Sequence, residues 1–74
     1  MRGFLFEHSR ADVTSPLGVR RTKIAAIAAS RSEAFSLAGD ILPLIGIRLF
    51  DEGPDAFRIA QEAGVKDGEA KALD

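Results

Sequence analysis

Residues 23–33 read Lys-Ile-Ala-Ala-Ile-Ala-Ala-Ser-Arg-Ser-Glu, and they decide the fold because they contain the start of a helix. Ser30 and Glu33 form a capping box, in which the Ser30 hydroxyl accepts a hydrogen bond from the main-chain N–H of Glu33. The Glu33 carboxylate should reach back to the main-chain N–H of Ser30. The box therefore predicts a helix that begins directly after Ser30.

The apolar run before this box, residues 20–29, fits either a strand or a helix. As a helix it would place Ile24, Ile27 and Ala28 on one stripe, and alanine is the strongest helix former. The N-cap residue has a non-helical backbone, however, so Ser30 favours a strand over 20–29. A strand that leads directly into a helix predicts a small α+β domain.

The remaining elements follow from alternation, helical stripes and end signals. Phe4, Phe6 and His8 share one face of an N-terminal strand. Pro54 suits the first position of a helix, and Gly64 suits the position just after its end. The expected elements are strands over 2–9, 20–29 and 44–50 and helices over 31–41 and 54–63, with a loop over 10–19.

This order, β-β-α-β-α, predicts a three-stranded mixed sheet with two helices. A right-handed crossover through the first helix would place the third strand beside the first. The strand over 2–9 then lies in the centre of the sheet, and both helices cover one face. Residues 1–64 form the single expected domain, and the polar residues 65–74 form a flexible tail.

Composition limits the class of protein. The chain has 74 residues and no cysteine, so neither a disulfide framework nor a thiolate zinc site is expected, and a cytoplasmic location fits. No stretch has the length of a membrane span or the pattern of a signal peptide. Residues 1–37 carry a net charge of +3 and residues 38–74 carry −4, which predicts two electrostatic ends.

No catalytic, metal or cofactor site is expected. His8 is the only histidine, and its place beside two phenylalanines predicts a packed side chain. The carboxylates Asp51, Glu52 and Asp55 fit helix capping and solubility better than a metal loop. No glycine cluster has the spacing of a phosphate-binding loop. The chain is therefore expected not to be an enzyme.

Two surfaces remain as candidates for binding. The cations Arg20, Arg21 and Lys23 fit nucleic acid, an acidic protein patch, or a plain solvated strand end. Leu44 and Phe50 should lie on the sheet face opposite the helices, where they would form an interface unless another segment covers them. The predicted partner-binding residues are Arg20, Arg21, Lys23, Leu44, Arg48 and Phe50.

The N-terminal hairpin, the helix that opens on Ser-x-x-Glu-Ala and the third strand resemble small inhibitors from phages and mobile elements, of the anti-CRISPR kind. The resemblance covers residues 2–50 and implies a protein without an active site that occludes the surface of a larger nucleoprotein complex. We therefore expect a non-enzymatic protein-binding module that inhibits a host defence or regulatory complex. A second copy of the chain, forming a homodimer, is a further candidate partner. The alternatives are a dimeric nucleic-acid-binding accessory or transcriptional regulator, and a self-assembling structural protein. No membrane partner is expected.

Overall fold

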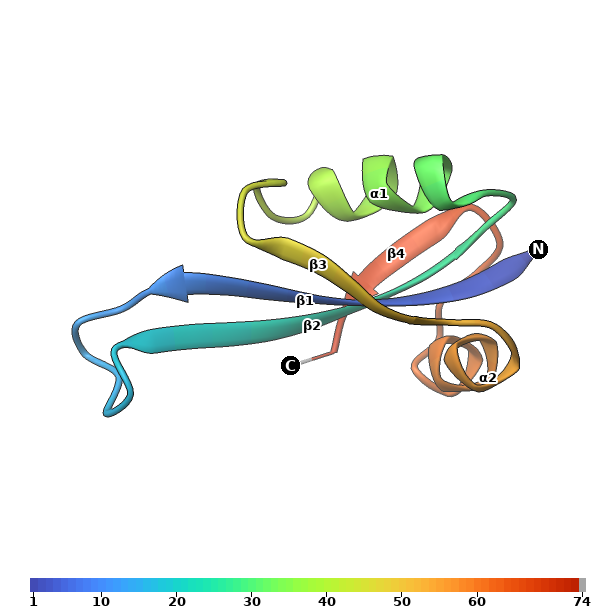
Figure 1. The fold of residues 1–74 in the computed structure, drawn as a ribbon. Coiled ribbons are helices and arrows are strands. Elements are labelled where there is room, and N and C mark those ends of the chain that lie inside the picture. The colour runs from blue at the N-terminus through green and yellow to red at the C-terminus, as the bar shows by residue number, and fades with distance from the viewer. Residues whose placement is uncertain (74) are drawn as a thin grey trace.

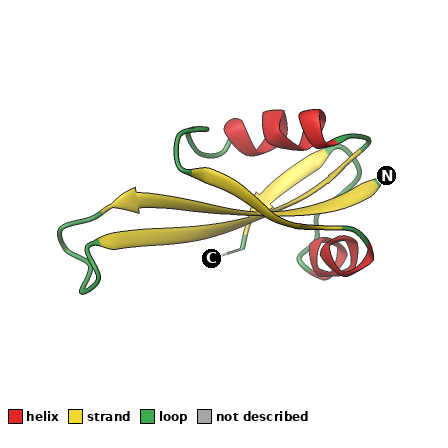
Figure 2. Cartoon of the chain, in the orientation of Figure 1, coloured by secondary structure: helices red, strands yellow, loops and turns green. Residues whose placement is uncertain are grey.

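The fold is a four-stranded antiparallel sheet with one helix on each face, as seen in a computed structural model that describes residues 1–73 (Figures 1 and 2). The strand order across the sheet is β3-β1-β2-β4. The elements in chain order are β1 (Arg2–Ala11), β2 (Val19–Ala28), α1 (Arg31–Gly39), β3 (Ile47–Glu52), α2 (Pro54–Glu62) and β4 (Glu69–Ala72).

The junction between β2 and α1 confirms the strand prediction. Ser30 has an extended backbone (φ −148°, ψ 163°), and its hydroxyl accepts a hydrogen bond from the N–H of Glu33 at 3.2 Å. The Glu33 carboxylate accepts from the N–H of Ala29 at 3.3 Å, one residue earlier than the expected Ser30. The cap therefore closes over the last residues of β2 and starts α1 at Arg31.

The central position of β1 is also confirmed. β1 pairs with β2 on one side and with β3 on the other, as the right-handed crossover predicts. The description of the sheet as mixed was wrong, because β2 and β3 run parallel but β1 separates them. All neighbouring strands among residues 1–73 are antiparallel.

The prediction of a flexible tail over 65–74 was wrong for the residues that the structure describes. Val65 is buried, and β4 pairs with β2 along its full length. The N–H of Gly68 donates to the carbonyl of Ile27 at 2.8 Å, and the N–H of Leu73 donates to the carbonyl of Lys23 at 2.8 Å. The sequence Glu-Ala-Lys-Ala lacks strand-forming residues, and its pairing comes from main-chain hydrogen bonds to the edge of β2. Residue 74 lies outside the described range.

The two helices lie on opposite faces of the sheet, which corrects the expectation that both cover one face (Figure 1). Alanines of α1 pack on Phe4, Phe6 and Ile24. Alanines of α2 pack on Leu5 and Ile27 of the other face. The second helix thus covers the apolar surface that the sequence analysis expected to be open to a partner.

The third strand begins later than expected, at Ile47 in place of residue 44. Gly46 has φ +91°, a conformation that ends the preceding turn and that extended residues do not adopt. The N–H of Ile47 donates to the carbonyl of Leu44 and closes this turn at 3.1 Å. Leu44 and Ile45 consequently lie in a loop, and Ile45 is 90% exposed.

β1 and β2 form a long hairpin. Each strand has ten residues, and pairing continues from Arg2 opposite Ala28 to Ala11 opposite Val19. The outer part of the hairpin projects beyond both helices (Figure 1), and the molecule measures 38 × 21 × 16 Å. The connecting loop spans residues 12–18, shorter than the expected 10–19.

We predict that Asp12, in the loop of the hairpin, contributes to the stability of the fold in a pH-dependent way. The Thr14 hydroxyl and then the Thr14 main-chain N–H donate to the Asp12 carboxylate, at 2.6 and 2.9 Å, and lower its pKa. Because the pKa is lower in the folded chain, this stabilisation is present above the unfolded pKa and is lost as the pH falls through the folded value. Carboxyl-detected NMR titration should show the lowered pKa of Asp12. Thr14→Val should raise that pKa, and an unchanged value would contradict the assignment.

Candidate partner-binding surface

The structure divides the six predicted binding residues between two faces. The register places Lys23 and Arg48 on either side of Glu7 and places Arg21 opposite Ser9, all on the face that α2 partly covers. Arg20 lies opposite Arg10 on the other face. Side chains alternate along a strand, so neighbouring Arg20 and Arg21 cannot share a surface.

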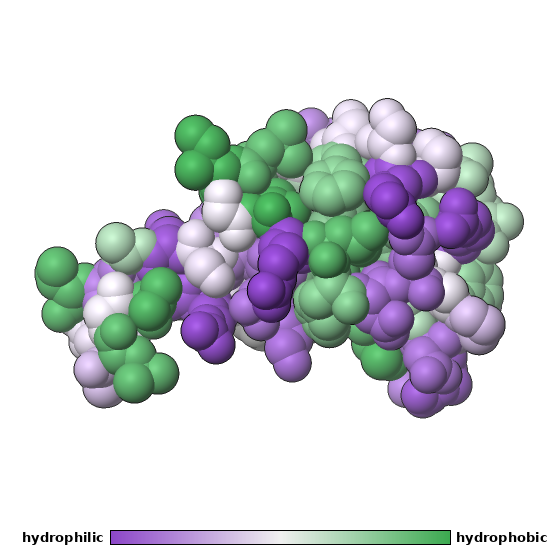
Figure 3. Space-filling view, in the orientation of Figure 1, coloured by the Kyte–Doolittle hydropathy of each residue, from purple (hydrophilic) through white to green (hydrophobic). Residues whose placement is uncertain are grey.

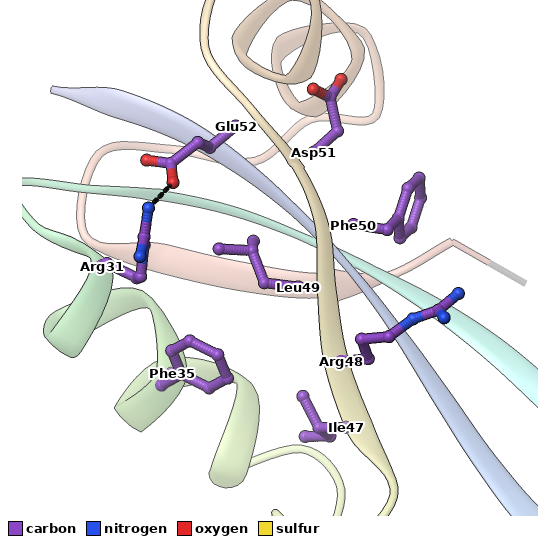
Figure 4. Close-up of a pocket in the computed structure, with 8 residues that line it drawn as sticks. All are labelled: Arg31, Phe35, Ile47, Arg48, Leu49, Phe50, Asp51 and Glu52. Carbon is purple, nitrogen blue, oxygen red and sulfur yellow. Dashed lines mark hydrogen bonds and ion pairs between the residues drawn. The ribbon is translucent and has the colours of Figure 1, made fainter.

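Phe50 joins the first group, and Leu44 does not. The β1–β3 register shifts at Phe50, which leaves this residue without a partner on β1. In Figure 4, Arg48, Phe50 and Asp51 project from one side of β3, while Leu49 and Glu52 project from the other toward α1. Leu44 lies near Gly39 at the end of α1. The structure therefore brings together Arg21, Lys23, Arg48 and Phe50.

Three cations surround one carboxylate in this group. A Glu7 carboxylate oxygen lies 4.0 Å from Nε of Arg21 and 3.9 Å from an Nη atom of Arg48, and Lys23 is its cross-strand neighbour. Both arginine side chains are more than half exposed, so these pairs add little stability. Glu7 and Asp51 together carry two negative charges on this side of the sheet against three positive charges, so the net charge of the group is positive.

The outer edge of β3 has no strand beside it among residues 1–73. The N–H of Ser9 donates to the carbonyl of Gly46 at 3.0 Å, so the main-chain N–H and C=O groups of Gly46 face β1. These groups point to opposite sides in successive residues of a strand. Those of Arg48 therefore point toward β1, and those of Leu49 point away from it. The Leu49 N–H and C=O are therefore oriented as an added strand would require.

A groove of about 720 Å³ lies along this edge, between β3 and α1 (Figure 4). Phe35, Ile47 and Leu49 give it an apolar wall, and Phe50 extends this wall onto the other side of the strand. Arg31 and Glu52 form an ion pair at one end. Figure 3 shows an apolar band over β3 and α1 with hydrophilic atoms on both sides. An apolar centre with a charged rim is typical of a protein-binding surface.

Among the other polar residues that were considered as possible site residues, His8 and Glu52 contribute to the structure. His8 is buried on the same face as Phe4 and Phe6, as predicted. Glu52 pairs with both Arg2 and Arg31, which ties β3 to the N-terminus and to α1. No group of three His, Cys, Asp or Glu residues in the described part of the chain is arranged to hold a metal ion.

Three residues of the groove, Arg31, Phe35 and Leu49, were not predicted to bind a partner. Phe35 and Leu49 carried an apolar signal, but both were assigned to the core. The predicted strand order already placed the third strand at an edge of the sheet, but the groove also depends on the position of α1 beside that edge.

No helix in the described residues combines the length and apolar character that a membrane crossing requires. No family model, curated protein or solved structure matches the chain.

Proposed function

We propose that this chain is a non-enzymatic protein-binding module that adds an extended segment of a partner protein to the outer edge of β3. The observation that carries the proposal is the outward Leu49 main chain beside an apolar groove. In this mode of recognition, main-chain hydrogen bonds supply affinity and alternate side-chain pockets supply specificity.

The two sides of β3 define the segment that it would take. Residues on one side of the added strand would contact Phe35 and Leu49 in the groove, so apolar side chains fit there. Residues on the other side would lie next to Arg48 and Phe50, where an acidic or aromatic side chain fits. The partner segment should therefore alternate between apolar and acidic or aromatic residues.

Inhibition of a host defence complex, the narrower expectation from the resemblance to anti-CRISPR proteins, stays a prediction. Edge pairing would give such an inhibitor a way to occlude the partner's surface. The sheet face opposite α1 is excluded as the docking surface over the part that α2 covers.

Phe50→Ala should weaken this interaction about tenfold, because truncation of a central aromatic residue at an interface typically costs 1–2 kcal/mol. Phe50 is 44% exposed, so the substitution should leave the fold intact. Twelve-residue peptides selected from a displayed random library against the wild-type chain would supply the probe. Fluorescence anisotropy then gives the dissociation constant for each variant.

Ile45→Ala is the matched control, since Ile45 is an exposed apolar residue outside the groove. Its affinity for the selected peptides should equal that of the wild type. Amide hydrogen exchange adds a direct test, because the Leu49 N–H should exchange rapidly alone and slowly with peptide. Peptides that bind both variants equally, without protecting Leu49, would show that β3 is not the site. Protection of Leu49 in the absence of peptide, together with dimeric mass, would assign the edge to a second copy of the chain.

A further inference from the structure

We propose that the projecting end of the β1–β2 hairpin, residues 9–21, binds duplex DNA by lying in the major groove. This segment is named the hairpin arm below. The inference is independent of the β3 site, because it concerns the opposite end of the hairpin from both helices (Figure 1).

The hairpin arm is a two-stranded ribbon. β3 pairs with β1 as far as His8, and β4 pairs with β2 from Ile24, so beyond these points the two strands pair mainly with each other. Two further hydrogen bonds lie just beyond these points, from Ser9 to Gly46 and from Leu73 to Lys23, and both are at the base of the hairpin arm. The major groove of B-form DNA, about 12 Å wide, admits a two-stranded β-ribbon.

The positive charges of the hairpin arm destabilise the pairing of its two strands. Arg10 and Arg20 lie directly opposite each other, and like charges in that position destabilise a strand pair. Neither forms an ion pair among the described residues. The one acidic residue of the arm, Asp12, is hydrogen-bonded to Thr14 in the turn. A polyanion would relieve this repulsion.

The cations lie on both faces of the ribbon. Arg10 and Arg20 occupy one face, while Arg21 and its neighbour Lys23 occupy the other. A groove in duplex DNA presents phosphates on two walls, so a ribbon inside it can use cations on both faces. A flat anionic membrane or a single acidic protein patch would contact only one face at a time.

The tip of the hairpin arm carries two apolar side chains that are almost fully exposed. Val13 is 99% exposed and Leu17 is 84% exposed, and Figure 3 shows apolar atoms at this end of the molecule. In the major groove, the methyl group of thymine offers an apolar contact to such side chains. Binding in the major groove would thus give a role to Val13 and Leu17, which are not part of either core.

The test is fluorescence anisotropy of a labelled 20-base-pair duplex with the full-length chain at 50 and 200 mM salt. Three to four phosphate contacts predict that affinity falls about 40- to 150-fold over this range. The double variant Arg10→Gln, Arg20→Gln should bind at least about tenfold more weakly at 50 mM salt, with a shallower salt dependence. Its thermal midpoint should equal or exceed that of the wild type because the like-charge pair is gone.

Arg58→Gln, Lys66→Gln is the control, since it removes two cations from α2 and the segment after it. This variant should bind the duplex as the wild type does. Val13→Ser, Leu17→Ser should weaken binding without changing its salt dependence. Absence of duplex binding at 50 mM salt, or an equal loss in the control, overturns the proposal. Binding to vesicles with 30% phosphatidylserine, or to a single strand at least as tightly as to the duplex, assigns the hairpin arm to another ligand.

Discussion

Gly3→Ala should destabilise the protein by about 3 kcal/mol or more, the upper end of the cost of overpacking a core. A Cβ atom at position 3 would lie 2.6 Å from the carbonyl carbon of Ala56 and closer still to the main chain of Phe57. All of these atoms belong to the backbone of α2, so no side chain can rotate away, and the whole helix must move. A chain of this size has a free energy of unfolding of about 4–11 kcal/mol. Urea denaturation followed by circular dichroism measures the loss.

Gly39→Ala is the matched control for this substitution. A Cβ atom there would meet only the side chain of Leu44, at 3.0 Å, and Leu44 is exposed and able to move. Alanine also suits the helical position better than glycine does, so stability should be equal or slightly higher. Equal stability of the Gly3→Ala and Gly39→Ala variants would show that α2 does not press on β1.

Phe6→Ala should cost about 3–5 kcal/mol, the usual range for removing a buried aromatic ring. Phe6 is fully buried in the core under α1, and its ring meets that of Phe35 edge-on, with centroids 4.9 Å apart and planes at 70°. Four of the other buried members of this core are alanines, whose short side chains cannot extend into the space that the ring would leave. We therefore expect the cavity to persist in part. Urea denaturation again gives the change.

Phe6→Leu is the control, because it retains most of the volume and should cost about 1.5 kcal/mol or less. A double-mutant cycle with Phe35→Ala should yield a coupling of about 0.5–1.5 kcal/mol for the ring pair. If Phe6→Ala lost no more stability than Phe6→Leu, the α1 core would not be packed as described.

Both predictions concern the two cores in which the helices cover the faces of the sheet. Because the helices cover these parts of the sheet, partners must bind elsewhere. With α1 on one face and α2 on the other, the outer edge of β3 and the hairpin arm are two surfaces that neither helix covers. The two proposals use these surfaces separately. One chain would then be able to hold an extended protein segment at β3 and a duplex at the other end.

Local signals in the sequence predicted much of the secondary structure. The capping box at Ser30 identified the start of α1 and, through its extended backbone, the strand before it. Pro54 marked the start of α2, and Gly64, with φ +86°, marked the turn after its end. The crossover through α1 predicted that the third strand lies beside β1, which places β1 in the centre. These features depend on residues close in sequence or on connection rules that hold for most chains.

The candidate site was predictable only in part. Arg21, Lys23, Arg48 and Phe50 were named from charge and exposure. The register brings the three cations to one side of the sheet, and the register shift at Phe50 adds this residue. Alternation within β2 was enough to separate Arg20 from Arg21, since neighbouring strand residues face opposite ways. The free edge of β3 followed from the predicted strand order, in which the third strand lies outside the first. The groove was not predictable in this way, because it also depends on where α1 lies beside that edge.

By itself, then, the sequence determined where most of the elements begin and end and which residues of β1 share a face. Only the tertiary structure decided that α2 covers the second face and that residues 69–72 complete the sheet. Gly3 lets the backbone of α2 approach β1 closely, and β4 is held by main-chain groups of β2 that carry no side-chain signature. Such contacts join backbone segments that are far apart in the chain, so no local pattern of side chains predicts them.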